Sequence, residues 1–155
     1  MSTAAPYRHV ADRSELVATV AELGFQRLRD GLLPAVGGHN GRDHVVESGG
    51  AYLRRALDTP DFYRVLFGAE VQRVGHPGLG RAAEVAFAVL LEAVDAARFD
   101  RALRTKDARA LAGSLWSVVH GAASLDIGGD LHAHVDVDVT SEDLVVETIS
   151  VLTAP

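Results

Sequence analysis

Trp116 and His120 are the side chains with the greatest potential for site chemistry in this sequence of 155 residues. Trp116 is its only tryptophan, and the two are separated by one helical turn, so on a helix they would share a face. An indole beside an imidazole in an Ala- and Val-rich segment could line an apolar pocket, with the imidazole as the polar contact for a small ligand. The same pair could equally fill a core, with His120 bonded to a backbone carbonyl. The residues alone leave both interpretations open.

A second group of polar side chains lies nearer the C-terminus and offers imidazoles and carboxylates, ligands that suit zinc or a similar ion: His132, His134, Asp136 and Asp138. Alternate residues align their side chains only on an extended strand, and a lone strand would have no partner here. We therefore expect a solvated loop over 128–139, with no metal and no cofactor.

Nucleophilic catalysis is the third chemistry that the sequence could suggest. Ser117 and Ser124 lie near His120 in the chain. Ser–His–Asp chemistry, however, also requires an orienting carboxylate and an oxyanion hole, and the sequence indicates neither. The Gly-rich turns match no phosphate-binding motif. The sequence therefore favours a protein that is not an enzyme.

Helices must position these side chains, because apolar residues recur at helical spacing along the whole chain. We predict one all-α helical bundle with helices over 13–34, 41–57, 60–67, 81–99, 107–125 and from 140 or 141 onward. Thr59-Pro60 is a helix start signal, and Asp12 with Glu15 resembles a capping box. Segment 75–78 is expected to be a loop. Segment 81–99 is apolar nearly all round, which predicts a central helix.

Composition excludes several classes of protein. The formal net charge of −6 argues against strong nucleic-acid binding, which depends on neutralising phosphates. The chain has no cysteine, so disulfides and thiolate chemistry are excluded. No apolar run is long enough to cross a bilayer, and the N-terminus has no signal-peptide core. We expect a cytoplasmic protein with no membrane partner.

Three segments resemble TetR-like transcriptional regulators in order and spacing. Residues 4–16 look like the end of the recognition helix and the start of the helix that links it to the ligand domain, with Val10 where the family usually has Phe. Residues 51–68 resemble the helix, Pro-started turn and short helix that wall the ligand cavity. Trp116, His120 and Gly121 resemble the Trp–His–Gly (WHG) signature of one class of their ligand-binding domains.

The resemblance implies two parts, a recognition-helix remnant over 1–11 and a C-terminal ligand-binding and dimerisation domain over 12–155. It implies a small apolar or amphipathic effector in a cavity, for which the candidate lining residues are Trp116, His120, Tyr63, Leu66, Phe67 and Phe87. It also implies a homodimer through about 107–126 and 141–153. The first of these segments contains small residues that permit close helix approach: Ala112, Gly113, Gly121, Ala122 and Ala123.

One departure from the family affects the expected function. A helix-turn-helix needs its first helix to brace the recognition helix, and most of that unit is missing before Met1. Tyr7, Arg8 and His9 would contact phosphates only in a protein that has the missing helices. A late gene start and a genuine truncation both explain this departure, and the fit of residues 4–16 favours the first.

The expected function is therefore the ligand-sensing and dimerising part of a TetR-like regulator, which would control DNA binding in the intact protein. Two alternatives remain open. One is a remnant that heterodimerises with full-length paralogues and blocks their DNA binding. The other is a small helical metal-binding protein or enzyme that uses His120, or His132 and His134.

Overall fold

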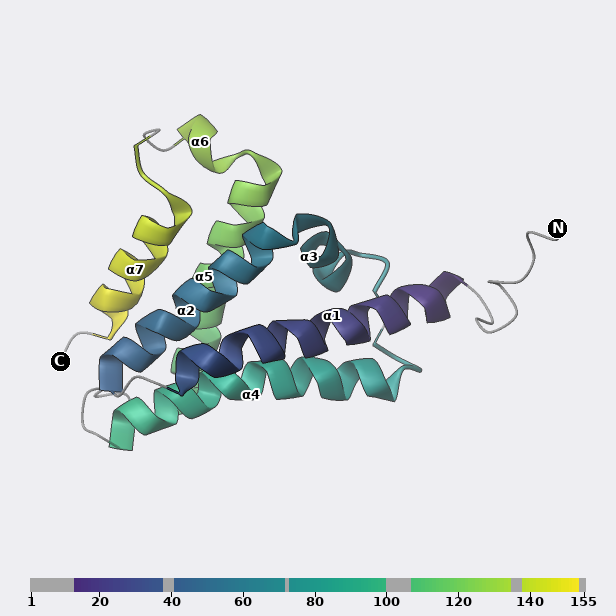
Figure 1. The fold of residues 1–155 in the computed structure, drawn as a ribbon, viewed down its shortest axis with the longest axis horizontal. Helices are drawn as coiled ribbons and strands as arrows, with labels where there is room; N and C mark the ends of the chain where they lie inside the picture. The colour runs from purple at the N-terminus through teal and green to yellow at the C-terminus, as the bar shows by residue number, and fades with distance from the viewer. Residues whose placement is uncertain (1–12, 38–40, 72, 100–106, 135–137, 154–155) are drawn as a thin grey trace, which may run out of the picture.

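The computed structural model describes residues 13–37, 41–71, 73–99, 107–134 and 138–153, and these residues contain helices and no strand (Figure 1). The prediction of an all-α fold is confirmed. The helices of this part of the chain are α1 (Arg13–Val36), α2 (Gly41–Asp58), α3 (Pro60–Phe67), α4 (Pro77–Phe99), α5 (Ala108–Gly128), α6 (Leu131–His134) and α7 (Ser141–Leu152). Asp12 and the three residues predicted to contact DNA, Tyr7, Arg8 and His9, lie outside the described residues.

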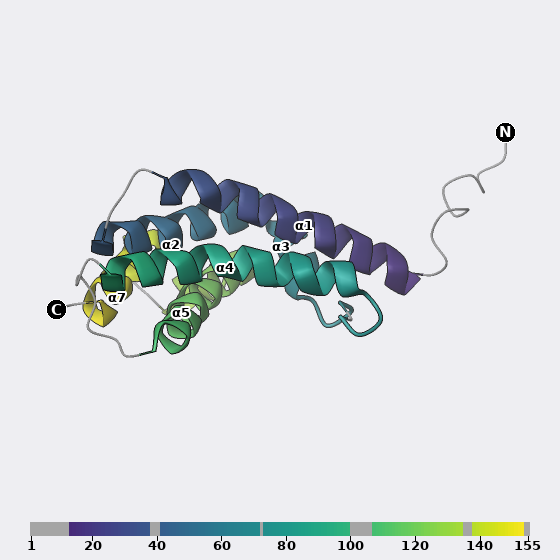
Figure 2. The ribbon, with the colours of Figure 1, turned by 90° about the horizontal axis from the view of Figure 1, so that it is seen from below.

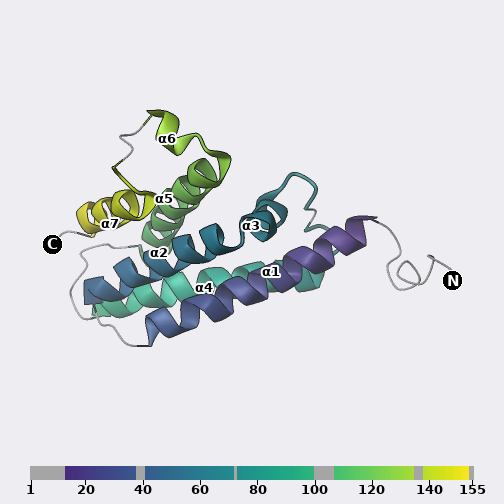
Figure 3. The same cartoon turned by 45° about the horizontal axis from the view of Figure 1, so that its top comes forward.

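The centre of the bundle is α2, which packs against α1, α3, α4, α5 and α7. On one side of it α1 and α4 run side by side (Figure 2), and on the other lie α5 and α7 (Figure 3). The prediction of α4 as the central helix is wrong. It packs against α1, α2 and α5, but it keeps a solvent-facing side that includes Arg81, Glu84 and Glu92.

Short-range side-chain chemistry sets the starts of α5 and α7 where the sequence predicts them. The Asp107 carboxylate accepts hydrogen bonds from the backbone N–H groups of Arg109 and Ala110, at 2.9 and 3.0 Å. Thr140 and Asp143 form a reciprocal capping box at the start of α7. These caps satisfy N–H groups that have no partner within the helix.

Two predicted boundaries and one predicted helix start signal differ in detail from the structure. Pro77 and Gly78 belong to the first turn of α4 rather than to a loop, because Pro is well suited to the first helical position. Residues 131–134, predicted as loop, form the single turn α6. Thr59 precedes α3 as predicted, but its hydroxyl donates to the Arg55 carbonyl at 3.0 Å instead of capping α3.

The buried face of α1 includes only some of its leucines. Leu28 and Leu32 are buried, but Leu16 and Leu23 are 44% and 47% exposed. Ala18 and Ala21 are buried in their place. Helical spacing identifies a set of apolar residues, but the crossing of α1 over its neighbours decides which of them face the core.

Candidate functional site

A network of ring contacts, which also reaches Phe25 of α1 through Phe67, contains six ring side chains from four other helices that we name the aromatic cluster. Its members are Tyr52 of α2, Tyr63 and Phe67 of α3, Phe87 of α4, and Trp116 and His120 of α5. The Trp116 and His120 ring centroids are 5.3 Å apart, and those of Phe67 and His120 are 4.3 Å apart. The prediction that Trp116 and His120 share a helical face is therefore confirmed.

Two phenols converge on the imidazole of the cluster. The Tyr63 hydroxyl lies 2.5 Å from Nδ1 of His120, and the Tyr52 hydroxyl lies 3.3 Å from the same nitrogen. The two hydroxyls are 3.3 Å from each other. The Tyr63 hydroxyl is also within 3.3 Å of the His120 backbone carbonyl. Tyr52, Tyr63 and His120 thus form a connected polar centre inside the ring cluster.

Burial determines the protonation states at this centre. Desolvation raises the pKa of Tyr52 and of Tyr63, so both remain phenols. Desolvation lowers the pKa of His120, so its imidazole is neutral at pH 7. In the tautomer that carries the ring proton on Nε2, Nδ1 of the neutral imidazole accepts a hydrogen bond from a phenol hydroxyl. His120 can therefore offer an N–H donor on its other side.

The cluster has a buried floor and a partly exposed rim. Tyr52 and Tyr63 are 6% and 4% exposed. The four remaining side chains are half-buried: Phe67, Phe87, Trp116 and His120. A ligand at the rim would meet ring faces and the imidazole of His120. This chemistry suits an apolar or amphipathic molecule with one polar group.

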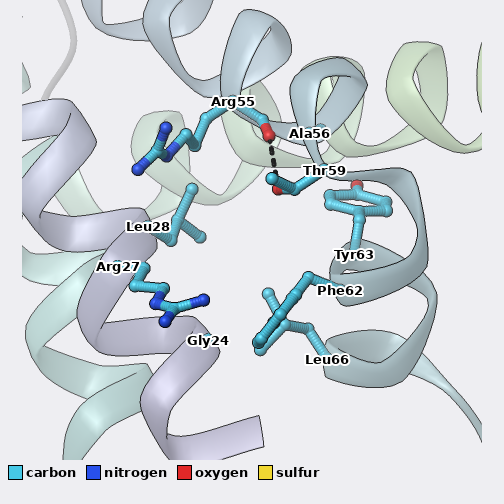
Figure 4. Close-up of a pocket in the computed structure, with 9 residues that line it drawn as sticks. All are labelled: Gly24, Arg27, Leu28, Arg55, Ala56, Thr59, Phe62, Tyr63 and Leu66. Carbon is cyan, nitrogen blue, oxygen red and sulfur yellow. Dashed lines mark hydrogen bonds between the residues drawn. The ribbon is translucent and has the colours of Figure 1, made fainter. Parts of the chain in front are cut away.

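A cavity of about 190 Å³ lies beside the cluster, where α1, α2 and α3 meet (Figure 4). Its lining residues are Gly24, Arg27, Leu28, Arg55, Ala56, Thr59, Phe62, Tyr63 and Leu66. Tyr63 belongs to both the cluster and the cavity wall, so the two regions share a side chain. Trp116, His120, Phe67 and Phe87 are not among the lining residues.

Five of the six predicted ligand residues belong to the aromatic cluster. Leu66 does not: it is 6% exposed and faces α1 at Gly24, across the cavity. Tyr52 is not among the residues that the sequence predicts for the site, although it belongs to the polar centre. The available signal was its hydroxyl, because a buried tyrosine usually hydrogen-bonds a partner.

The predicted loop with the alternative metal site is placed apart from the cluster, on α6 and the residues after it. His132, His134 and Asp138 are exposed, and Asp136 lies outside the described residues. Among the residues that the structure describes, no three His, Asp or Glu side chains are grouped as metal ligands.

Membrane insertion can be assessed from the same helices. None of those in the described ranges combines the length and the apolar character needed to cross a bilayer.

Comparison with known proteins identifies the fold family. Residues 45–148 match the family described as the tetracyclin repressor-like C-terminal domain. The chain belongs to this family. The match spans more than half of the sequence and includes most of α2 and all of α3, α4 and α5, with all six residues of the aromatic cluster. The TetR-like resemblance is confirmed, whereas membership of the WHG class and the missing helix-turn-helix stay predictions.

Two solved structures share the fold of this TetR-like domain. One is a protein of unknown function from Rhodococcus sp. RHA1, with a TM-score of 0.83 and 25% identity, covering 98% of this chain and 77% of the other. The second is a protein assigned as regulatory, SCO4313, with a TM-score of 0.74 and 24% identity, covering 100% of this chain and 80% of the other. A search of curated proteins gives no match.

Proposed function

We propose that this chain senses a small apolar or amphipathic effector and dimerises as part of a TetR-like transcriptional regulator. Its membership of the tetracyclin repressor-like C-terminal domain family supports a role in transcriptional regulation. The regulatory assignment of one similar structure agrees with that role. In this proposal the chain contributes the sensing and dimerising part, and DNA contact requires helices that precede it.

The aromatic cluster is the observation that carries the sensing role. It joins α2, α3, α4 and α5 through ring contacts and places a polar centre behind a half-buried rim. A ligand that contacts Trp116 and His120 would therefore contact a side-chain network shared by four helices. If it binds one arrangement of these helices more tightly than another, it shifts the population toward that arrangement.

A probe with both apolar and polar groups tests the sensing role directly. We expect anilinonaphthalene sulfonate to bind saturably and to bind Trp116→Ala about tenfold more weakly, because the indole supplies a large apolar surface. Leu33→Ala is the matched control, since Leu33 is a 49% exposed residue of α1 outside the cluster. Equal affinity for the parent and Trp116→Ala would show that the ligand site lies elsewhere.

The face formed by α5 and α7 supports the dimer. These helices lie together on the side of α2 away from α1 (Figure 3). They expose Leu125, Val146, Val151 and Leu152 at 46%, 38%, 69% and 45%. A Cβ added to Gly121 would meet nothing within 4 Å. An apolar face with small residues suits close packing against the same helices of a second copy, through about 107–126 and 141–153.

Sedimentation velocity tests this interface. The parent is expected to sediment as a dimer, whereas Gly121→Arg should shift it toward monomer by placing a charged side chain in the interface. Gly80→Arg is the control, because a Cβ at Gly80 on α4 also meets nothing within 4 Å. A monomeric parent, or a Gly121→Arg variant as dimeric as the control, would contradict the proposed interface.

A further inference from the structure

The cavity between α1, α2 and α3 combines an apolar wall with two guanidinium groups (Figure 4). Leu28 of α1 and Phe62 and Leu66 of α3 supply hydrocarbon and ring surface. Arg27 reaches from α1 toward Phe62, and its Cζ lies 4.9 Å from the centroid of that ring. Arg55 enters from α2 on the other side of Leu28. The site therefore offers positive charge next to an apolar surface.

These two arginines differ from their neighbours in lacking a carboxylate. Within the described ranges, no acidic residue lines the cavity, and neither Arg27 nor Arg55 forms a salt bridge. By contrast, Arg29 pairs with Asp30 at 2.5 Å and Arg64 pairs with Asp61 at 3.0 Å. The two guanidiniums lie on opposite sides of Leu28 (Figure 4), and the Arg55 side chain packs along Gly31 of α1. An anion placed in the cavity would be attracted by both charges and could accept bidentate hydrogen bonds from a guanidinium.

We propose that this cavity binds a small aromatic carboxylate. Its ring would lie against Leu28, Phe62 and Leu66, and its carboxylate would accept hydrogen bonds from Arg27, with Arg55 as a second positive charge at the cavity wall. The volume of about 190 Å³ limits the ligand to roughly one ring with a short substituent, because a cavity of about 150 Å³ holds benzene. Ring stacking on Phe62 and a carboxylate–guanidinium fork satisfy both kinds of surface.

The walls of the site give its occupancy a structural consequence. A Cβ at Gly24 of α1 would lie 2.5 Å from Cδ2 of Leu66, so α1 and α3 are already in close contact at one end of the cavity. A ligand held by Arg27 and Arg55 would tie α1 to α2 at the other. The role of this ligand as the effector rests on the proposed sensing function. Binding of the ligand to the cavity does not, and it is measured independently of that function.

Isothermal titration calorimetry with phenylacetate tests the site, with 2-phenylethanol as a neutral ligand of similar shape. A ligand of this size should bind with a Kd on the order of 0.1–1 mM. We expect Arg27→Gln and Arg55→Gln each to weaken phenylacetate binding about fivefold, the effect of losing a partly exposed charge contact. Arg29→Gln, which removes the same charge from α1 outside the cavity, should leave the Kd unchanged.

The binding of 2-phenylethanol should be weaker than that of phenylacetate and insensitive to all three substitutions. The inference is overturned if phenylacetate does not bind saturably at concentrations about tenfold above the expected range. It is also overturned if Arg29→Gln weakens binding as much as Arg27→Gln, because the effect would then be a general loss of charge. If Trp116→Ala no longer binds an effector that Arg27→Gln binds normally, the proposed sensing function is supported and this site is rejected.

Discussion

Gly49 marks a close approach of α2 to α7, and its replacement by Ala tests how tightly α7 is packed. A Cβ there would overlap Cδ1 of Ile149 and lie 3.5 Å from a Val119 methyl and 3.6 Å from a Val145 methyl. Ile149 and Val145 are 1% and 0% exposed, so the displaced side chain has no solvent to enter. Ala favours a helix interior by about 1 kcal/mol over Gly. Overpacking a filled core costs about 1–3 kcal/mol. We expect a net loss of about 1 kcal/mol in the free energy of unfolding.

Gly80→Ala provides the matched control for this prediction. It lies in α4, and a Cβ there meets nothing within 4 Å, so it should gain about 0.5–1 kcal/mol from helix propensity alone. The difference between the two variants removes the propensity contribution and leaves the packing cost, about 2 kcal/mol. Urea denaturation followed by circular dichroism at one protein concentration measures both. If Gly49→Ala is as stable as Gly80→Ala, the close packing of α2 and α7 is refuted.

Three further predictions concern the polar centre and the helix caps. Tyr63→Phe removes the hydroxyl 2.5 Å from His120 Nδ1 and should lower the free energy of unfolding by about 1 kcal/mol; unchanged urea stability would contradict that hydrogen bond. Burial lowers the pKa of His120 below the ordinary histidine value of 6.5, so at a pH just below 6.5 the unfolded chain binds more protons than the folded one. The free energy of unfolding should therefore fall as the pH drops below 6.5. His120→Asn should flatten that part of a pH series of urea midpoints, and an equally steep profile would exclude this origin. Thr140→Ala removes the cap of α7 and should lower the free energy of unfolding by about 1 kcal/mol in the same assay. Thr19→Ala loses only an exposed hydrogen bond to the Glu15 carbonyl and should change it little. Equal losses in the two variants would argue against the capping box.

The helix starts could be predicted from the sequence because the groups that create them lie within a few residues of one another. Asp107 accepts from N–H groups two and three residues ahead, and Thr140 pairs with a residue three ahead. The choice of central helix could not be predicted in the same way. The apolar composition of α4 suggests burial, but α2, with two adjacent glycines at Gly49 and Gly50, packs against more of its neighbours.

The candidate site shows the same division between local and distant information. Trp116 and His120 are one helical turn apart, so their shared face follows from helix geometry. Tyr52 reaches His120 across 68 residues of chain, and no local pattern indicates that contact. The cavity depends on how α1 crosses α2 and α3, so its existence and the presence of two arginines in its wall follow only from the three-dimensional arrangement.

The docking of α7 onto α2 has a consequence for the order of folding. Arg42 in the first turn of α2 donates to the Thr153 hydroxyl at 3.0 Å and also to the Ser150 carbonyl, across 111 and 108 residues. During synthesis the face of α2 that receives Ile149 stays uncovered until the last helix leaves the ribosome. Contacts this distant in sequence require closing a long loop, and they form slowly. A nascent chain stalled before α7 would therefore present an apolar face prone to aggregation.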